Sequence, residues 1–162
     1  MPSTMTRRRI LVIDDEPSFT RLLRLNLEMT GRYEVREENR GAAALATAEE
    51  FQPDVILLDL IMPDRDGASV AEQLKQGEKL KHIPILFVTA LVSKQETTQQ
   101  EGVIGGNLFI AKPVTPDELV RWIERCLEQR GESARSGQPA GVVSGPIFSS
   151  RSTPQGERGE TR

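Results

Sequence analysis

The stretch Val55-Ile56-Leu57-Leu58-Asp59-Leu60-Ile61-Met62-Pro63-Asp64-Arg65-Asp66-Gly67 decides the fold of this chain. Four apolar residues lead into one carboxylate, and such a run bounded by turn residues is typical of a strand buried on both faces of a parallel sheet. Asp59 then lies at the carboxyl end of the strand, the edge at which open α/β sheets bind their ligands. On this stretch alone, a carboxylate that only ends the strand is an equal alternative, so the function of Asp59 depends on what else reaches this edge.

Other apolar runs have the same form. Residues 9–13 lead into Asp14-Asp15-Glu16, residues 84–88 into Thr89-Ala90, and residues 107–111 into Lys112-Pro113. A weaker alternating pattern at 33–37 predicts one more strand. Helical patterns fall between and after the strands, at 17–31, 41–51, 67–76, 93–100 and 115–130, with Asn39 as a candidate cap of the second helix. This fivefold alternation predicts an α/β fold with a doubly wound parallel sheet and helices on both faces.

Composition limits the function classes. The chain has 162 residues and a net charge of −3, which gives no general reason to expect nucleic-acid binding. No apolar run approaches the ~20 residues of a membrane span. The single cysteine, Cys126, excludes an internal disulfide and lies in a helical pattern, as a buried thiol would. We therefore expect a soluble cytoplasmic protein.

Polar side chains follow four of the predicted strands: Asp14 and Asp15, Asp59, Thr89 and Lys112. The carboxyl ends of parallel strands share one edge, so these side chains should meet. Three adjacent carboxylates repel one another unless a cation is present, and Mg²⁺ prefers such oxygen ligands. A carboxylate can attack phosphorus to give an acyl phosphate, while an ammonium and a hydroxyl hold the phosphoryl oxygens. These residues therefore predict a Mg²⁺-dependent phosphoryl-accepting site.

These motifs resemble the receiver domain of two-component response regulators, of the single-domain chemotaxis-regulator type. The matching segments cover about residues 7–130 and are Ile13-Asp14-Asp15, Asp59 to Gly67, Thr89-Ala90 and Phe109 to Pro113. The resemblance implies a flavodoxin-like fold whose five parallel strands have the order 2-1-3-4-5. It also implies a cis peptide bond at Lys112-Pro113.

The resemblance assigns the acids their roles. Asp59 would be the phosphoacceptor. Asp15 and Asp59 would bind Mg²⁺ directly, together with the backbone carbonyl of Ile61. Asp14 would hold the metal mainly through water.

The other matching residues would handle the phosphoryl group. Thr89 would bond it and move toward it, Lys112 would pair with it, and Phe109 would be the switch aromatic that rotates inward. Access to the phosphoryl group would be lined by Ile61, Ala90 and Leu91. The chain departs from the family at Gly102 to Gly106 and in the unusually polar fourth helix.

The expected organisation is a flexible N-terminus at 1–6, a receiver domain at 7–130 and a disordered Gly/Pro/Ser-rich tail at 131–162. The implied phosphoryl donor is a sensor histidine kinase or a His-phosphotransfer protein. With no second folded domain expected, output would pass through protein contacts of the helix 4–strand 5–helix 5 face to an unknown target. The protein would be a monomer or a weak phosphorylation-dependent dimer, without nucleic-acid or membrane partners.

Three alternatives remain open beside a stand-alone receiver. An aspartyl-nucleophile phosphatase usually has a second acid two residues after the nucleophile, where this chain has Ile61. A flavin-binding domain of the same fold class would need a phosphate loop after the first strand, where Asp14-Asp15-Glu16 would repel the phosphate. A receiver-shaped scaffold that is never phosphorylated would not need the full acid set. As a receiver, the protein would catalyse only its own phosphorylation and dephosphorylation. Of the alternatives, the phosphatase is the one that acts on a separate substrate.

Overall fold

The structure is a computed structural model of the chain. It describes residues 6–91, 103–104 and 107–136, with side chains described only within 6–91 and 107–130. The helix expected at 93–100, the tail from residue 137 onward and residues 1–5 lie outside the described residues. Among the described residues, no helix is long and apolar enough to cross a membrane.

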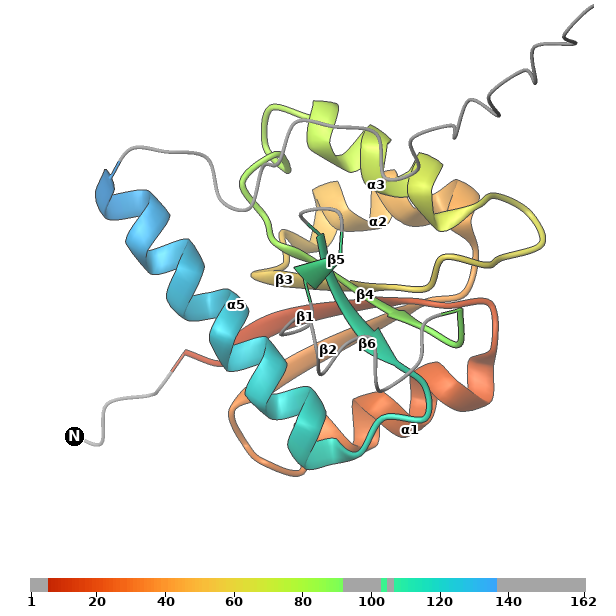
Figure 1. The fold of residues 1–162 in the computed structure, drawn as a ribbon, viewed down its shortest axis with the longest axis horizontal. Coiled ribbons are helices and arrows are strands. Elements are labelled where there is room, and N and C mark those ends of the chain that lie inside the picture. Colours follow the sequence, from red (N-terminus) through yellow and green to blue (C-terminus); the bar gives the residue numbers. More distant parts are fainter. Residues whose placement is uncertain (1–5, 92–102, 105–106, 137–162) are drawn as a thin grey trace, which may run out of the picture.

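One twisted sheet forms the middle layer of the described fold (Figure 1). Its strands are β1 (Arg8–Ile13), β2 (Tyr33–Glu38), β3 (Val55–Leu58), β4 (Ile85–Thr89), β5 (Val103–Ile104) and β6 (Asn107–Ala111). The strand order is β2-β1-β3-β4-β6-β5, and the first five strands in this order pair in parallel. This confirms the predicted five-stranded parallel sheet and its order, with β6 as the fifth parallel strand.

The outer edge of the sheet carries one strand that the sequence did not predict. β5 pairs antiparallel with β6, so that Ile104 lies opposite Asn107. Only Gly105 and Gly106 separate the two strands in the sequence. A strand of two residues is too short to show an alternating pattern, which is why it escaped prediction.

Helices cover both faces of the sheet, α1 and α5 on one and α2 and α3 on the other (Figure 1). Their bounds are α1 (Pro17–Glu28), η1 (Gly41–Ala43), α2 (Ala44–Phe51), α3 (Gly67–Gln76) and α5 (Pro116–Ser136). The predicted end of the last helix near Arg130 is wrong, because α5 continues to Ser136. A single interior glycine such as Gly131 costs about 1 kcal/mol relative to alanine, which weakens a helix without ending it.

Apolar side chains form one core on each side of the sheet. Leu11, Ile13, Ile56 and Leu58 point into the core under α2 and α3. The alternate residues of the same strands point into the core under α1 and α5, where Cys126 is also buried. With both faces covered, β1 and β3 are buried along their shared length, and the residues that follow them are fixed in place.

Candidate functional site

Three carboxylates meet where β1 and β3 end. The two strands are parallel neighbours, and Ile13 pairs with Leu58, so the residues that follow them emerge side by side. Asp14 and Asp59 are buried and Asp15 is half-buried, and one carboxylate oxygen of each lies within 4.8 Å of the others. A backbone hydrogen bond from the Asp59 N–H to the Ile13 carbonyl, 3.0 Å long, continues the strand pairing to this point.

One ammonium faces these acids from the end of β6. Lys112 Nζ lies 2.6 Å from Asp14 Oδ2 and 3.7 Å from Asp59 Oδ2. It also lies 4.1 Å from the centre of the Phe19 ring on α1, which adds a cation–π contact. Three carboxylates against one ammonium leave a negative surplus in a largely buried site.

Burial and charge both shift the pKa of Asp59. Burial raises the pKa of this carboxyl above its usual value of 3.8, and the neighbouring Asp14 and Asp15 raise the pKa further. Lys112 and the Ile61 N–H act in the opposite direction without cancelling the rise. A divalent cation would remove this penalty, and three clustered carboxylate oxygens are ligands that suit Mg²⁺. The residues present therefore fit a magnesium ion.

The expected phosphoryl-contact residues end the next strands. Thr89 is buried at the end of β4, and its Oγ1 accepts a hydrogen bond of 3.3 Å from the Leu91 N–H. The Lys112 N–H donates to the Thr89 carbonyl at 2.9 Å, which ties the ends of β4 and β6 together. Ile61, Ala90 and Leu91, the residues expected to line access to the phosphoryl group, are exposed.

The expected switch aromatic points inward. Phe109 is buried on β6 and stacks on Phe87 of β4, with 5.0 Å between ring centres. The Lys112-Pro113 peptide bond is cis, as the resemblance implied.

Gly67 holds the loop that follows Asp59, and any larger residue at this position would push the backbone apart. The Gly67 N–H donates to the Leu60 carbonyl at 2.8 Å. A Cβ atom built on Gly67 would lie 2.1 Å from the Asp59 carbonyl oxygen, far inside contact distance. Asp66 caps α3 by accepting the Ser69 N–H. Helix α3 therefore begins directly against the backbone of the candidate phosphoacceptor.

Sequence reasoning missed a group of polar residues beside Asp14. Asn39 was expected to cap the second helix, and this is wrong: η1 and α2 have no side-chain cap bond from their N-cap residues. The Asn39 amide instead contacts the Asp14 carbonyl and Thr20. The helix start is held by Asp64, whose carboxylate accepts the Gly41 and Ala42 N–H groups across the molecule. Asn39 directly follows β2, so the strand-end rule that found the acids would also have found it.

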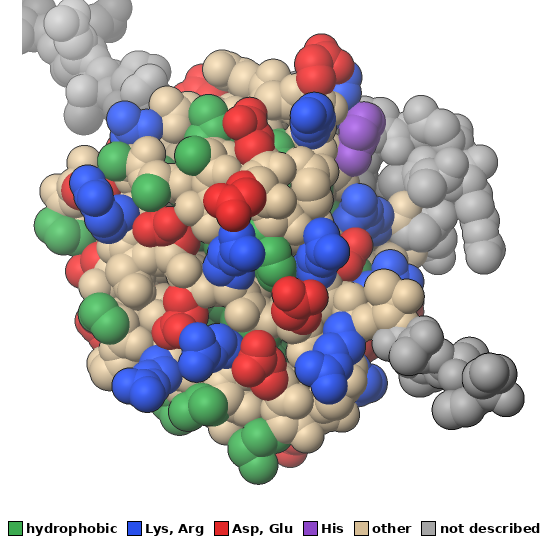
Figure 2. Space-filling model, turned by 180° about the vertical axis from the view of Figure 1, so that it is seen from behind, with side chains coloured by type: hydrophobic (Ala, Val, Ile, Leu, Met, Phe, Trp, Pro, Cys, Tyr) green, Lys and Arg blue, Asp and Glu red, His purple; other side chains and the backbone are tan. Residues whose placement is uncertain are grey.

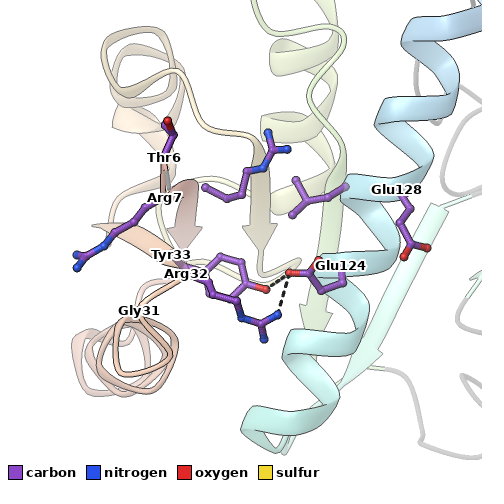
Figure 3. Close-up of a pocket in the computed structure, with 9 residues that line it drawn as sticks. Thr6, Arg7, Gly31, Arg32, Tyr33, Glu124 and Glu128 are labelled. Atoms are coloured by element: carbon purple, nitrogen blue, oxygen red, sulfur yellow. Dashed lines mark hydrogen bonds and ion pairs between the residues drawn. The ribbon is translucent and has the colours of Figure 1, made fainter. Parts of the chain in front are cut away.

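A second cluster of charged residues lines a pocket at the opposite, amino edge of the sheet (Figure 3). Here the Tyr33 hydroxyl and the Arg32 guanidinium both meet the Glu124 carboxylate on α5. Arg130 of the same helix contacts Asp54 at 3.2 Å. Glu124 in this pocket, and Asp54 beside it, are thus each paired with an arginine within the chain.

Charge on the outer surface is mixed. In the view of Figure 2, Lys and Arg side chains alternate with Asp and Glu side chains, without a continuous field of one sign. The described residues also include ion pairs such as Arg36–Glu50 at 3.4 Å and Arg24–Glu37 at 2.9 Å. A face of this kind offers no broad positive footprint for a phosphate backbone.

Comparisons with known proteins agree with the geometry. Residues 10–124 match the sequence profile of the response regulator receiver domain. The DNA-binding dual master transcriptional regulator RpaA of Synechocystis sp. is 33% identical over 140 residues, which cover 86% of this chain and 57% of RpaA. The alkaline phosphatase synthesis transcriptional regulatory protein PhoP of Bacillus subtilis is 37% identical over 132 residues, 81% of this chain and 53% of PhoP. The chain thus spans little more than half the length of these two relatives.

A solved structure adds a parallel for the acid site. The receiver domain of the sensor histidine kinase PA1611 from Pseudomonas aeruginosa PAO1, solved with a magnesium ion coordinated in its active-site cleft, superposes with a TM-score of 0.63. It is 30% identical, and the match covers 76% of this chain and 99% of that domain. With the profile matched from β1 into α5 and the acids gathered at one sheet edge, the chain belongs to the family of response regulator receiver domains.

Proposed function

We propose that this domain accepts a phosphoryl group on Asp59, with Mg²⁺ as cofactor, and passes the signal on through protein contacts. The observation that carries the proposal is geometric: the carboxylates of Asp14, Asp15 and Asp59 meet beside one ammonium, that of Lys112. Burial of Asp59, followed by its acidic neighbours, raises the pKa of its carboxyl against the opposing effect of Lys112. A structural ion-pair network would be balanced, whereas an acid surplus in a buried site indicates a functional cation.

The chemistry assigned to Asp59 is one displacement. A carboxylate oxygen of Asp59 forms a bond to phosphorus while the P–N bond of a donor phosphohistidine breaks. The electron pair of that bond stays on the imidazole nitrogen, which is then protonated from solvent. Bound Mg²⁺ would supply positive charge to the transferring phosphoryl oxygens. Asp15 and Asp59, the Ile61 carbonyl and, through water, Asp14 are the groups proposed to hold it.

Lys112 and Thr89 are assigned to the phosphoryl group once it is transferred. Lys112 Nζ is already 3.7 Å from Asp59 Oδ2, so an oxygen on that side is within reach of a small movement. Thr89 Oγ1 accepts the Leu91 N–H at a long 3.3 Å, so its own O–H can donate to a phosphoryl oxygen. Thr89 moving toward the phosphoryl group would change the space beside the stacked Phe109. We assign output to the β6 and α5 side of the molecule for this reason.

A kinase or a His-phosphotransfer protein must bring its phosphohistidine to this edge. Helix α1 starts directly after the acid loop, and it exposes Leu22, Leu25 and Met29 with exposed fractions of 55%, 49% and 84%. We assign this apolar stripe to the phosphoryl donor. Leu25→Ser should slow transfer from a donor protein while labelling by acetyl phosphate stays unchanged, because the small donor needs no docking surface.

The test of the central assignment is labelling by radioactive acetyl phosphate. Asp59→Ala should not be labelled, and chelation of Mg²⁺ should abolish labelling of the wild type. Asp117→Ala, which removes an exposed acid in the first turn of α5, is the matched control and should label normally. Labelling of Asp59→Ala at the wild-type level would refute the assignment. A wild type that binds Mg²⁺ but is never labelled would favour the receiver-shaped scaffold instead.

A further inference from the structure

A chain of polar contacts runs from the acid loop to the surface of α1. It begins at the Asp14 carbonyl, passes through the side chains of Asn39, Thr20 and Glu37, and ends at Arg24. None of these four side chains belongs to the phosphoryl chemistry proposed above. The contacts join the ends of β1 and β2 to the first helix.

Asn39 makes the contact that matters for the site. Its Nδ2 donates to the Asp14 carbonyl at 2.8 Å and to Thr20 Oγ1 at 2.9 Å. The carbonyl of Asp14 belongs to the peptide unit that joins Asp14 to Asp15. Because peptide units are planar, fixing this oxygen fixes the direction in which the chain continues into Asp15.

The remaining groups of Asp14 are held from other sides. Its N–H donates to the Glu38 carbonyl at 3.1 Å, its Oδ1 accepts the Glu16 N–H at 2.9 Å, and its Oδ2 faces Lys112. The Asn39 amide therefore completes the set of bonds that orients the Asp14–Asp15 peptide. Among the described residues, the Asp15 carboxylate has no hydrogen-bond or ion-pair partner. The direction of the Asp15 side chain therefore depends on this peptide.

Thr20 and Glu37 set the orientation of Asn39. The Thr20 hydroxyl is buried, and its hydrogen faces two acceptors, Glu37 Oε1 at 2.9 Å and the Pro17 carbonyl at 3.1 Å. Its oxygen can therefore accept the Asn39 amide. Arg24 pairs with the other oxygen of Glu37 at 2.9 Å. An ionised acceptor at the end of the chain strengthens each bond before it, and the Arg24 charge keeps Glu37 from adding to the negative surplus at the site.

We propose that Asn39 is a positioning residue of the magnesium site, which holds the Asp14–Asp15 peptide so that Asp15 faces the metal, and that Thr20 orients Asn39 for this task. The inference rests on the proposed function, because it assumes that the acids bind Mg²⁺. Residues behind metal ligands typically change metal affinity by about 10- to 100-fold when they are replaced.

The experiment measures Mg²⁺ affinity on the full chain, by calorimetric titration with MgCl₂ and by the rise in melting temperature with Mg²⁺ concentration. Asn39→Ala should weaken Mg²⁺ binding about tenfold. Asn39→Asp keeps the size of the side chain but turns an acceptor toward the Asp14 carbonyl, and it should weaken binding at least as much. Asp15→Asn, which alters a proposed ligand, gives the scale for a direct loss.

Thr20 offers a matched pair of variants. Thr20→Ser keeps the hydroxyl and should bind Mg²⁺ like the wild type, whereas Thr20→Val keeps the shape, loses the hydroxyl and should bind more weakly. The metal-free melting temperature separates positioning from general stability. If Asn39→Ala and Thr20→Val melt lower without metal but keep wild-type Mg²⁺ affinity, the residues only stabilise the fold and the inference is overturned. If the wild type binds no Mg²⁺, the metal site fails, and this inference fails with it.

Discussion

The two edges of the same sheet differ in how their charged side chains are paired. At the amino edge, Glu124 is shared by the Tyr33 hydroxyl and Arg32, and Arg130 pairs with Asp54 (Figure 3). At the carboxyl edge, the cluster of Asp14, Asp15 and Asp59 has Lys112 as its one ammonium among the described residues. Both edges contain buried or half-buried ionisable groups close together. At the carboxyl edge, three clustered carboxylates face one ammonium, whereas at the amino edge Glu124 and Asp54 each have an arginine partner.

This difference indicates which edge of the sheet has a function besides stabilising the fold. Charges paired inside the chain contribute modestly to stability and require no ligand. A buried surplus of one sign costs free energy in the empty protein and is released when an ion of the other sign binds. The size of the pocket at the amino edge is therefore a weaker guide to function than the imbalance at the carboxyl edge.

The largest expected difference between the edges comes from two glycines. Gly67 lies against the Asp59 backbone, where an added Cβ would be 2.1 Å from a carbonyl oxygen. Gly31 at the amino edge has φ +76° and no atom within 4 Å of an added Cβ. Gly67→Ala should cost about 3 kcal/mol of unfolding free energy and displace the Asp59 loop. Gly31→Ala should cost about 1 kcal/mol, since only its backbone conformation is strained.

Urea unfolding of both variants measures the two costs, and acetyl phosphate labelling of the folded fraction measures the site. Gly67→Ala should label poorly even where it is folded, while Gly31→Ala should label like the wild type. Equal stabilities for the two variants would contradict the claim that Gly67 is fixed by the site.

The carboxyl edge was largely predictable from the sequence, because its residues stand next to strong strand patterns. Asp14, Asp15, Asp59 and Lys112 each follow an apolar run, and parallel pairing is enough to bring such positions together. A position at a strand end does not by itself distinguish a site residue from a helix cap.

Asn39 shows this limit most clearly. An asparagine before an Ala-rich segment matches a helix cap as well as it matches a contact to another loop, and the competing cap is supplied by Asp64 from more than twenty positions away. Thr20 gave no signal because one threonine in an amphipathic helix is ordinary. The two-residue β5 and the continuation of α5 past Gly131 lack a periodic pattern that would reveal them.

Loss of the phosphoryl group should be slow at this site. Water must reach phosphorus past Ile61 and Leu91, whose exposed fractions are 58% and 57%. Neither side chain can orient a water by hydrogen bonding. Ile61→Asn combined with Leu91→Glu should speed dephosphorylation about tenfold, which corresponds to ~1.4 kcal/mol of barrier. Decay of labelled protein at constant Mg²⁺ measures the rate, and an unchanged half-life in a well-folded double variant would end the shielding hypothesis.

Removing one charged or polar group should have opposite effects on stability at the two edges. Asp59→Asn removes a charge that burial and two acids disfavour, so without metal it should stabilise the fold, by about 1 kcal/mol. Tyr33→Phe removes a satisfied hydrogen bond to Glu124 and should destabilise the fold by about 1 kcal/mol. Thermal melting in EDTA measures both changes. With saturating Mg²⁺ the gain of Asp59→Asn should disappear, because the wild-type carboxylate is then neutralised.

The smallest expected effect is the pH dependence of the stability changes caused by Asp59→Asn and Tyr33→Phe. The two edges of the sheet should differ in this pH dependence too. Burial raises the pKa of both Asp59 and Tyr33 above their usual values of 3.8 and 10.0. A raised pKa gives stability that is present below the usual value and is lost as pH rises through the folded value. For Asp59 that loss is complete in alkaline buffer, so the advantage of Asp59→Asn should be largest there and shrink as pH falls toward about 4. For Tyr33 the loss begins only above pH 10.0, so the deficit of Tyr33→Phe should stay constant through the neutral range and shrink in strong alkali. Thermal melting of the wild type, Asp59→Asn and Tyr33→Phe in EDTA, in buffers from about pH 4 to about pH 11, tests both pH dependences. An advantage of Asp59→Asn that grows on acidification would mean that Lys112 outweighs burial at Asp59, and the carboxyl edge would then be as well balanced as the amino edge.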